Sequence, residues 1–218
     1  MMIAQPRLST IDTHARYGGL LICGMNYGLL RGSTPQTEGD FPPWAQYFTH
    51  ESNRTNDKFV SRLALWFDWW GIPLEVNGSP TELNCAISQT NLFYDSSRSF
   101  ASRSTEEIQL AFKRLDATIT RLNISGLLLA SITMAETTRS QLRIGEWKTN
   151  TAGRFSLRRA LAGSLRVAVC PHPRCPQSRC DVESLAEEMR NWGNEVLTEW
   201  RKKQAEPKSA GDALPARA

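Results

Sequence analysis

Two short loops carry the residue types from which an active site could be built. The sequence His172-Pro173-Arg174 closely follows the largely apolar run 165–170, and Gly24-Met25-Asn26-Tyr27-Gly28 directly follows the apolar run 19–23. An imidazole can donate a hydrogen bond or bind a metal ion, and an amide carbonyl can hold a water molecule. Ligands of α/β sheets bind beyond the carboxyl ends of the strands, so both loops can contribute to one pocket. The sequence therefore predicts an active site.

The elements that must position these loops are strands that alternate with helices. Apolar side chains recur at helical spacing after Asn56, and Ser104 with Glu107 forms a capping box before a second helical stripe. This alternation predicts an α/β domain with three αβα layers and a central, mostly parallel four-stranded sheet. The expected strands are 19–25, 84–90, 126–132 and 165–170, and the expected helices are 56–70, 104–122, 134–143, 157–163 and 185–200, with 146–156 ambiguous.

Length and composition favour one folded domain. The chain has 218 residues, of which 40% are hydrophobic and 22% charged, which is enough apolar material for one core. We expect a single domain over 1–205 and a flexible tail over 206–218. Apolar stretches such as 126–132 are far shorter than the ~20 residues that span a bilayer, and the N-terminus lacks a secretory signal pattern. A monomeric, cytoplasmic protein is therefore expected, without a membrane partner.

The five cysteines argue against a disulfide framework, because their number is odd. Cys23 and Cys85 fall in expected strands and are interpreted as buried thiols. The other three surround the histidine of the second loop, although their spacing departs from the paired Cys-x₂₋₄-Cys ligands of zinc ribbons and fingers. The main interpretation includes no metal or other cofactor, and the alternative is a zinc-dependent interaction protein whose ligands are Cys170, His172, Cys175 and Cys180.

Positive charge is concentrated in one segment of the chain. Between Arg139 and Arg179 there are nine basic residues and a single acidic one, Glu146, so this segment carries +8 and the rest of the chain −4. Such asymmetry is typical of a surface that binds a polyanion, and the segment continues into the histidine loop. The alternative is an ordinary solvated basic surface.

Three of these motifs resemble those of the uracil-DNA glycosylase superfamily, and most closely its single-strand-selective monofunctional branch. Gly24-Met25-Asn26-Tyr27-Gly28 is similar to that branch's Gly-Met-Asn-Pro-Gly motif, and His172-Pro173-Arg174-Cys175-Pro176-Gln177 is similar to a shortened His-Pro-Ser-Pro-Arg-Asn-Pro-Gln motif. Between them, Cys85 to Asn91 resembles the strand that ends in the base-reading asparagine. The resemblance covers roughly residues 18 to 200. It implies the fold of that family and a monofunctional DNA glycosylase that flips a uracil or modified pyrimidine out of DNA.

The resemblance also implies roles for single residues. Cleavage of the N-glycosidic bond builds negative charge on the departing base, so His172 would donate a hydrogen bond to the base oxygen. Asn26 would hold the attacking water by its side-chain carbonyl, and Asn91 would read the edge of the flipped base. If the reaction needs a stronger base than asparagine, Glu38 and Asp40 are the nearest candidates. The lysines lie in no matched motif, so no Schiff base is expected.

The remaining candidate residues would surround the base or contact the DNA. Tyr27 stands where the resembled motif has proline, and the histidine loop is about two residues shorter, so the accepted base could be uracil or a bulkier pyrimidine, such as a modified cytosine of phage DNA. The product would then serve base-excision repair or antiviral defence. The cysteine set of the family's iron–sulfur branch is not reproduced, so no cluster is expected. Gly24, Met25, Tyr27, Phe41 and Phe93 are assigned to the base pocket, and Arg154, Arg158, Arg159 and Arg174 to DNA.

A second interpretation keeps the fold but not the catalysis. A catalytically weak nucleic-acid-binding module would use the same basic surface, and it is favoured if Asn26 and His172 do not converge.

Overall fold

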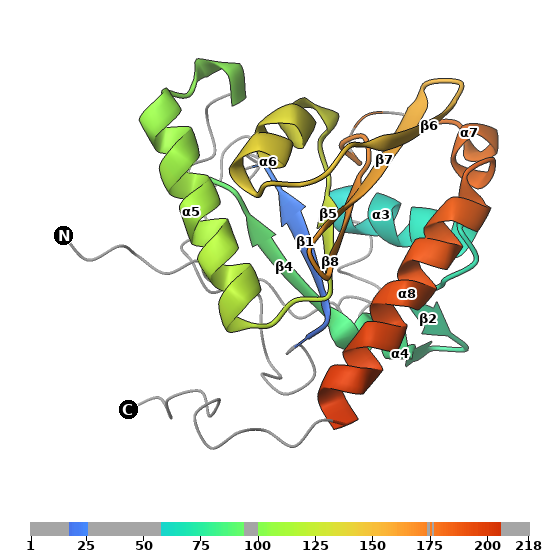
Figure 1. Cartoon of the computed structure of the whole chain (residues 1–218). Coiled ribbons are helices and arrows are strands. Elements are labelled where there is room, and N and C mark those ends of the chain that lie inside the picture. The colour runs from blue at the N-terminus through green and yellow to red at the C-terminus, as the bar shows by residue number, and fades with distance from the viewer. Residues whose placement is uncertain (1–17, 26–57, 94–99, 174, 176, 206–218) are drawn as a thin grey trace, which may run out of the picture.

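A mixed six-stranded sheet runs through the molecule, with its strands in the order β4-β1-β5-β8-β7-β6 (Figure 1). The first four strands are parallel, whereas β7 is antiparallel to β8 and β6 is antiparallel to β7. The expectation of a four-stranded, mostly parallel sheet is therefore wrong, because a hairpin extends the sheet beyond β8. The strands are β1 (Leu20–Gly24), β4 (Ile87–Asn91), β5 (Gly126–Leu129), β6 (Lys148–Ala152), β7 (Phe155–Ala162) and β8 (Leu165–Val169).

The structure is a computed structural model that describes residues 18–25, 58–93, 100–173, 175 and 177–205. The expected tail, 206–218, lies outside these residues. Within the described part of the chain, no helix combines the length and the apolar character needed to cross a membrane.

Helices cover both faces of the sheet (Figure 1). Leu20 and Ile22 of β1 point into a core built with α3 and α8, and the alternate residues Leu21 and Cys23 point into a second core built with α5. The capping box at the start of α5 is confirmed, because Ser104 and Glu107 bond to each other's backbone N–H groups. The helices are α3 (Lys58–Trp69), α4 (Glu82–Ala86), α5 (Thr105–Arg121), α6 (Ala135–Gln141), α7 (Arg179–Glu183) and α8 (Ala186–Ala205), with 3₁₀ turns η1 (Phe100–Ser102) and η2 (Ile132–Met134) and a separate small hairpin of β2 (Glu75–Val76) and β3 (Ser79–Pro80).

The hairpin corrects the expected short helix at 157–163. Leu157 and Leu161 are four residues apart, a spacing that also fits one face of a helix. In the structure the residues alternate instead: Phe155 and Leu157 are fully buried, while Ser156 and Arg158 are only half-buried on the other face. Burial against the core formed by α3 and α8 therefore selects a strand here, and the ambiguous segment before it contains the partner strand β6.

The start of the second expected strand is also corrected. Residues 84–86 belong to α4, whose N-terminus is capped by the Thr81 side chain, and β4 begins only at Ile87. Cys85 consequently lies on a helix and is exposed, so its interpretation as a buried strand thiol is wrong. Cys23 is buried, as expected.

Gly126 allows α8 to pack closely on the sheet, and this can be tested. A Cβ at Gly126 would lie 2.6 and 2.8 Å from the two Val196 methyl carbons, whereas a Cβ at Gly145 would meet only a carbonyl oxygen at 3.5 Å. We expect Gly126→Ala to lower the free energy of unfolding by about 1–3 kcal/mol through overpacking. Gly145→Ala should stay within about 1 kcal/mol of the parent protein. Urea denaturation measures both, and equal effects would contradict this account.

Candidate active site

The parallel strands deliver several candidate residues to one edge of the sheet. Gly24 and Asn91, the last residues of β1 and β4, are paired in register. The ladder continues past them, since Leu92 N–H donates to the Gly24 carbonyl at 2.9 Å. On the other side of the sheet, Cys170 N–H donates to Leu129 of β5 at 3.0 Å, and His172 follows two residues later. Asn91 and His172 therefore lie at the same, carboxyl edge, as an active site built from both requires.

Asn91 reaches inward across the end of the neighbouring strand. Its side-chain Oδ1 occupies the place where a Cβ of residue 24 would stand, so only glycine at that position leaves room for the amide. Asn91 is half-buried, and within the described residues its side chain makes no hydrogen bond. An amide held in this way keeps both a donor and an acceptor for a ligand.

The His172 ring turns toward the same place from the opposite side. It is half-buried and packs on Phe59 with ring centroids 5.4 Å apart and planes tilted by 57°. Phe59 comes from the first turn of α3, and its Cζ lies 3.9 Å from the Cβ position of Gly24. One buried aromatic ring thus connects the end of β1 with the histidine loop.

Helix α3 also holds the backbone of the histidine loop. Arg62 Nη1 donates a 2.8 Å hydrogen bond to the Pro173 carbonyl, and Cys175 N–H donates to the His172 carbonyl at 2.8 Å. The sequence pattern indicates only a core role for the start of α3. The single signal it offered was that Phe59 and Arg62, three residues apart, share one side of a helix.

Phe93 is less available than a base-stacking residue should be. It is 4% exposed, its ring packs 6.1 Å from Phe100, and the Arg103 guanidinium carbon lies 4.3 Å from its centroid. Met25 is half-buried and packs against the same core. Both residues lie close to the site edge, but Phe93 belongs to the core beneath it.

Six other candidate residues lie outside the described residues. These are the proposed water-binding residue, the two aromatic pocket residues, the alternative carboxylates and the arginine of the histidine loop. They are Asn26, Tyr27, Phe41, the pair Glu38 and Asp40, and Arg174.

The structure separates the three cysteines of the zinc interpretation. Cys170 is buried in the core, while Cys175 and Cys180 are exposed. Among the described residues, which include all four proposed ligands, no group of three or more His, Cys, Asp and Glu side chains could hold a metal ion. The geometry therefore gives no support to that alternative.

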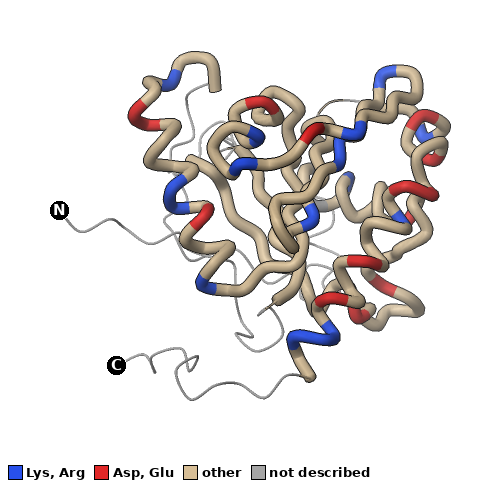
Figure 2. The backbone as a smooth tube through the Cα atoms, viewed as in Figure 1, with Lys and Arg blue, Asp and Glu red and all other residues tan. Residues whose placement is uncertain are grey.

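The predicted DNA-contacting arginines differ in their surroundings. Arg158 pairs with Glu136 of α6 at 2.6 Å, and Arg159 Nη1 donates to the Glu188 carbonyl of α8 at 2.9 Å. Arg154, in contrast, is exposed at the turn between β6 and β7. Along the backbone, acidic residues from other parts of the chain lie among those of the basic segment (Figure 2). The linear charge count therefore overstates the charge available to a ligand.

No protein-family model matches the sequence, and a search of curated proteins finds no match. The resemblance to the glycosylases accordingly rests on the three sequence motifs alone.

Burial divides the cysteines into two reactive classes. Desolvation by burial raises the pKa of the Cys23 and Cys170 thiols to about 12, which strongly disfavours the reactive thiolate near neutral pH. A thiol-specific reagent should modify Cys85, Cys175 and Cys180 rapidly in the folded protein and the other two only after denaturant is added. Peptide mass mapping identifies the modified residues, and fast modification of Cys170 would contradict the described loop.

The role of Arg62 can be tested without any assumption about activity. Arg62→Ala removes a half-buried hydrogen bond of about 1 kcal/mol, so hydrogen exchange at the Cys175 amide should accelerate about fivefold. Arg190→Ala is the matched control, because Arg190 Nε donates to the Trp70 carbonyl at 3.3 Å, beyond the far end of α3. Equal acceleration in both variants would indicate general destabilisation and refute a local role.

Proposed function

We propose that the protein is a monofunctional DNA glycosylase of the uracil-DNA glycosylase type. It would flip a uracil or modified pyrimidine out of DNA and hydrolyse its N-glycosidic bond, leaving an abasic site. The observation that carries the proposal is the convergence of Asn91 and His172. Asn91 reaches the Cβ position of Gly24, and His172 packs on Phe59, which also approaches Gly24; the two residues come to the carboxyl edge of the sheet from strands three steps apart.

The separation of β4 and β8 leaves room for a flipped base between the residues that follow or end them. Three steps of ~4.8 Å separate β4 from β8, so about 14 Å lies between the two backbones. Asn91 Oδ1 extends over the strand next to its own, and the His172 ring packs on Phe59. A pyrimidine between them could bond its carbonyl and imino edge to the Asn91 amide.

His172 would act on the leaving base. As the glycosidic bond breaks, negative charge accumulates on a base oxygen, and a fixed imidazole N–H pointing at this atom stabilises the transition state. No proton needs to be transferred for this effect. The hydrogen bond from Arg62 to Pro173 and the contact with Phe59 supply the rigidity that such a donor requires.

The attacking water would be held by Asn26, which follows Gly24 by two residues. Since Tyr27 replaces the proline of the resembled motif, we propose that the substrate range extends beyond plain uracil to bulkier pyrimidines. This range connects the enzyme either to base-excision repair or to defence against phage DNA.

A screen for base release is the direct test. DNAs that carry uracil, modified uracils or modified cytosines are incubated with the protein, and released base and alkali-labile sites are measured. We expect His172→Ala to lower the single-turnover rate by about 10²-fold, as loss of one oxyanion-type donor does, while DNA affinity changes little.

Cys175→Ser is the control within the same loop. It should keep full activity, whereas loss of bound zinc in this variant would favour the zinc interpretation. DNA binding without release of any base would instead favour the non-catalytic module and sink the glycosylase proposal.

A further inference from the structure

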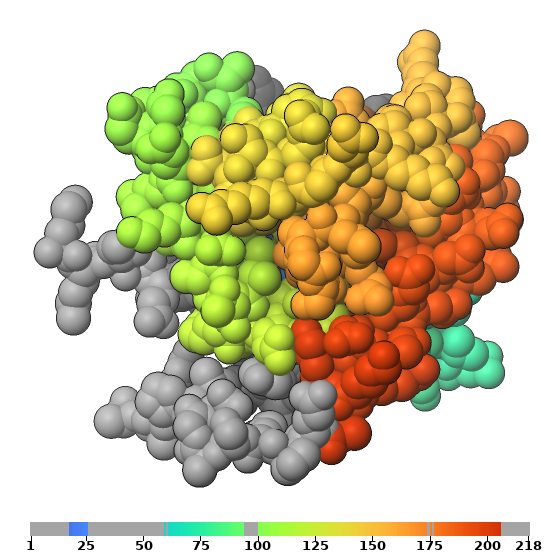
Figure 3. Space-filling model, viewed as in Figure 1, coloured from blue at the N-terminus to red at the C-terminus, as the bar shows by residue number. Residues whose placement is uncertain are grey.

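The β6–β7 hairpin extends beyond the edge of the sheet that carries His172. Val169, the last residue of β8, pairs with Arg158, so residues 155–157 of β7 and their partners 150–152 of β6 lie past the end of β8. Three strand residues correspond to about 10 Å. Because β7 is antiparallel to β8, this extension is on the carboxyl edge, and the hairpin tip protrudes from the molecular surface (Figure 3).

The extended hairpin is braced from two sides. Next to its tip, the Phe155 ring is fully buried and packs edge-on against Trp66 of α3, with centroids 5.2 Å apart. At its tip Arg154 N–H donates to Asp181 Oδ2 at 3.4 Å, and Gly153, with φ of +54°, leaves room for the same carboxylate. Asp181 belongs to α7, the helix that follows the histidine loop. The tip is therefore held in a defined position relative to that loop.

One face of the hairpin is committed to the protein core. Phe155 and Leu157 are fully buried in the core, and Asn150 donates to Glu188 of α8 at 2.5 Å. On the opposite face, two cross-strand pairs, Thr149 with Arg158 and Thr151 with Ser156, present three hydroxyl groups. Both threonines are exposed, and within the described chain none of the three hydroxyls has a hydrogen-bond partner.

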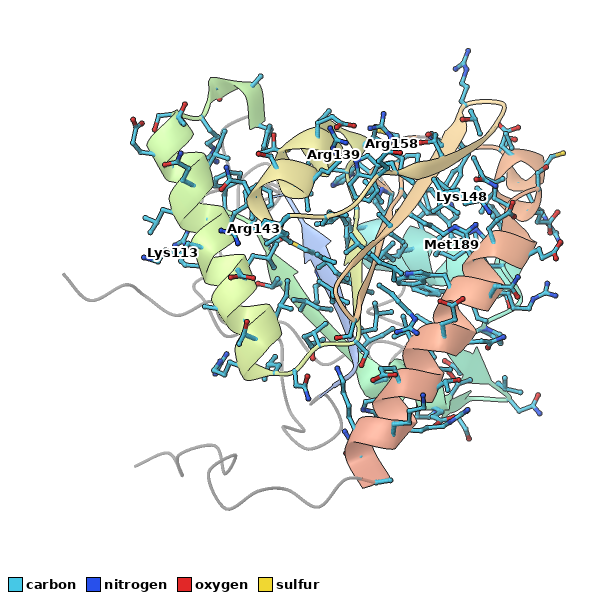
Figure 4. The ribbon with its side chains drawn as sticks, viewed as in Figure 1. Lys113, Arg139, Arg143, Lys148, Arg158 and Met189 are labelled. Carbon is cyan, nitrogen blue, oxygen red and sulfur yellow. The ribbon has the colours of Figure 1, made fainter. Side chains whose placement is uncertain are left out.

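The charge of the hairpin complements a phosphate backbone. Residues 148–162 include four basic side chains and no acidic one. Arg158 and Arg159 bond to α6 and α8, but the side chains of Lys148 and Arg154 are exposed and form no ion pair within the described residues. Lys148 and Arg158 are labelled in Figure 4. Arginine and hydroxyl donors are the groups that most often bind DNA phosphates, and such contacts fix register without reading sequence.

We propose that this hairpin is a phosphate-binding arm, in which the tip guanidinium of Arg154 and the hydroxyls of Thr149, Thr151 and Ser156 bind the DNA backbone beside the flipped base. The inference rests on the proposed function for the identity of the ligand. The count of basic residues in the sequence predicts DNA contacts from Arg158 and Arg159. The inference assigns these contacts instead to the tip of the hairpin and to the face that carries the three hydroxyl groups.

The test measures binding to unmodified DNA, so that it does not depend on base excision. Fluorescence anisotropy gives the affinity for a duplex and for a single strand of the same sequence between about 50 and 200 mM salt. Arg154→Ala should weaken binding several-fold and reduce the slope of log K against log salt by about 1. The isosteric double variant Thr149→Val with Thr151→Val should weaken binding about threefold with an unchanged slope, because it removes hydrogen bonds and no charge.

Lys113→Ala is the matched control for charge, since Lys113 is exposed on α5 and far from the hairpin (Figure 4). It should leave both affinity and slope unchanged. Parent-like binding by the Arg154 and threonine variants would overturn the inference even if the protein excises bases. Weakened binding in these variants would support it even if no base is released, so the two proposals can fail separately. A polyglutamate peptide that competes as well as DNA would also overturn it.

Discussion

The site edge depends on the packing of the first turn of α3 between the ends of β1 and β8. Phe59 contacts the His172 ring and approaches Gly24, while Arg62 bonds the carbonyl of Pro173. The hydrogen bonds between paired strands fix where β1 and β8 end at the carboxyl edge of the sheet. They do not orient the loops that follow these strands. The aromatic contact and the charged hydrogen bond supply that orientation, because both act on the loop itself.

At three positions, close packing depends on the absence of a side chain as much as on any contact. Gly24 has no Cβ, and this leaves the space that the Asn91 amide occupies. The same principle recurs at Gly126 beneath α8 and at Gly153 beside Asp181. In each case a glycine permits a close approach between elements that are distant in sequence: β4 against β1, α8 against β5, and α7 against the β6–β7 turn.

The distribution of charge illustrates how folding changes the meaning of a sequence pattern. A segment with nine basic residues appears strongly cationic in the chain, yet the fold places Glu136 against Arg158 and Glu195 against Arg166. Paired in this way, surface arginines contribute little to long-range attraction. The part of the basic segment that stays available to a ligand is smaller: the tip of the β6–β7 hairpin and the face that carries its three hydroxyl groups.

The sequence by itself determined the features that depend on local periodicity: four parallel strands, the capping box of α5, the burial of Cys23, and the arrival of Asn91 and His172 at one edge. Tertiary structure alone decided that residues 155–162 form a strand and that Cys85 faces solvent, because helical and strand spacing overlap in short segments and burial selects between them. It also decided the partners of Phe59 and Arg62. Such contacts join positions more than one hundred residues apart, and no local pattern encodes them.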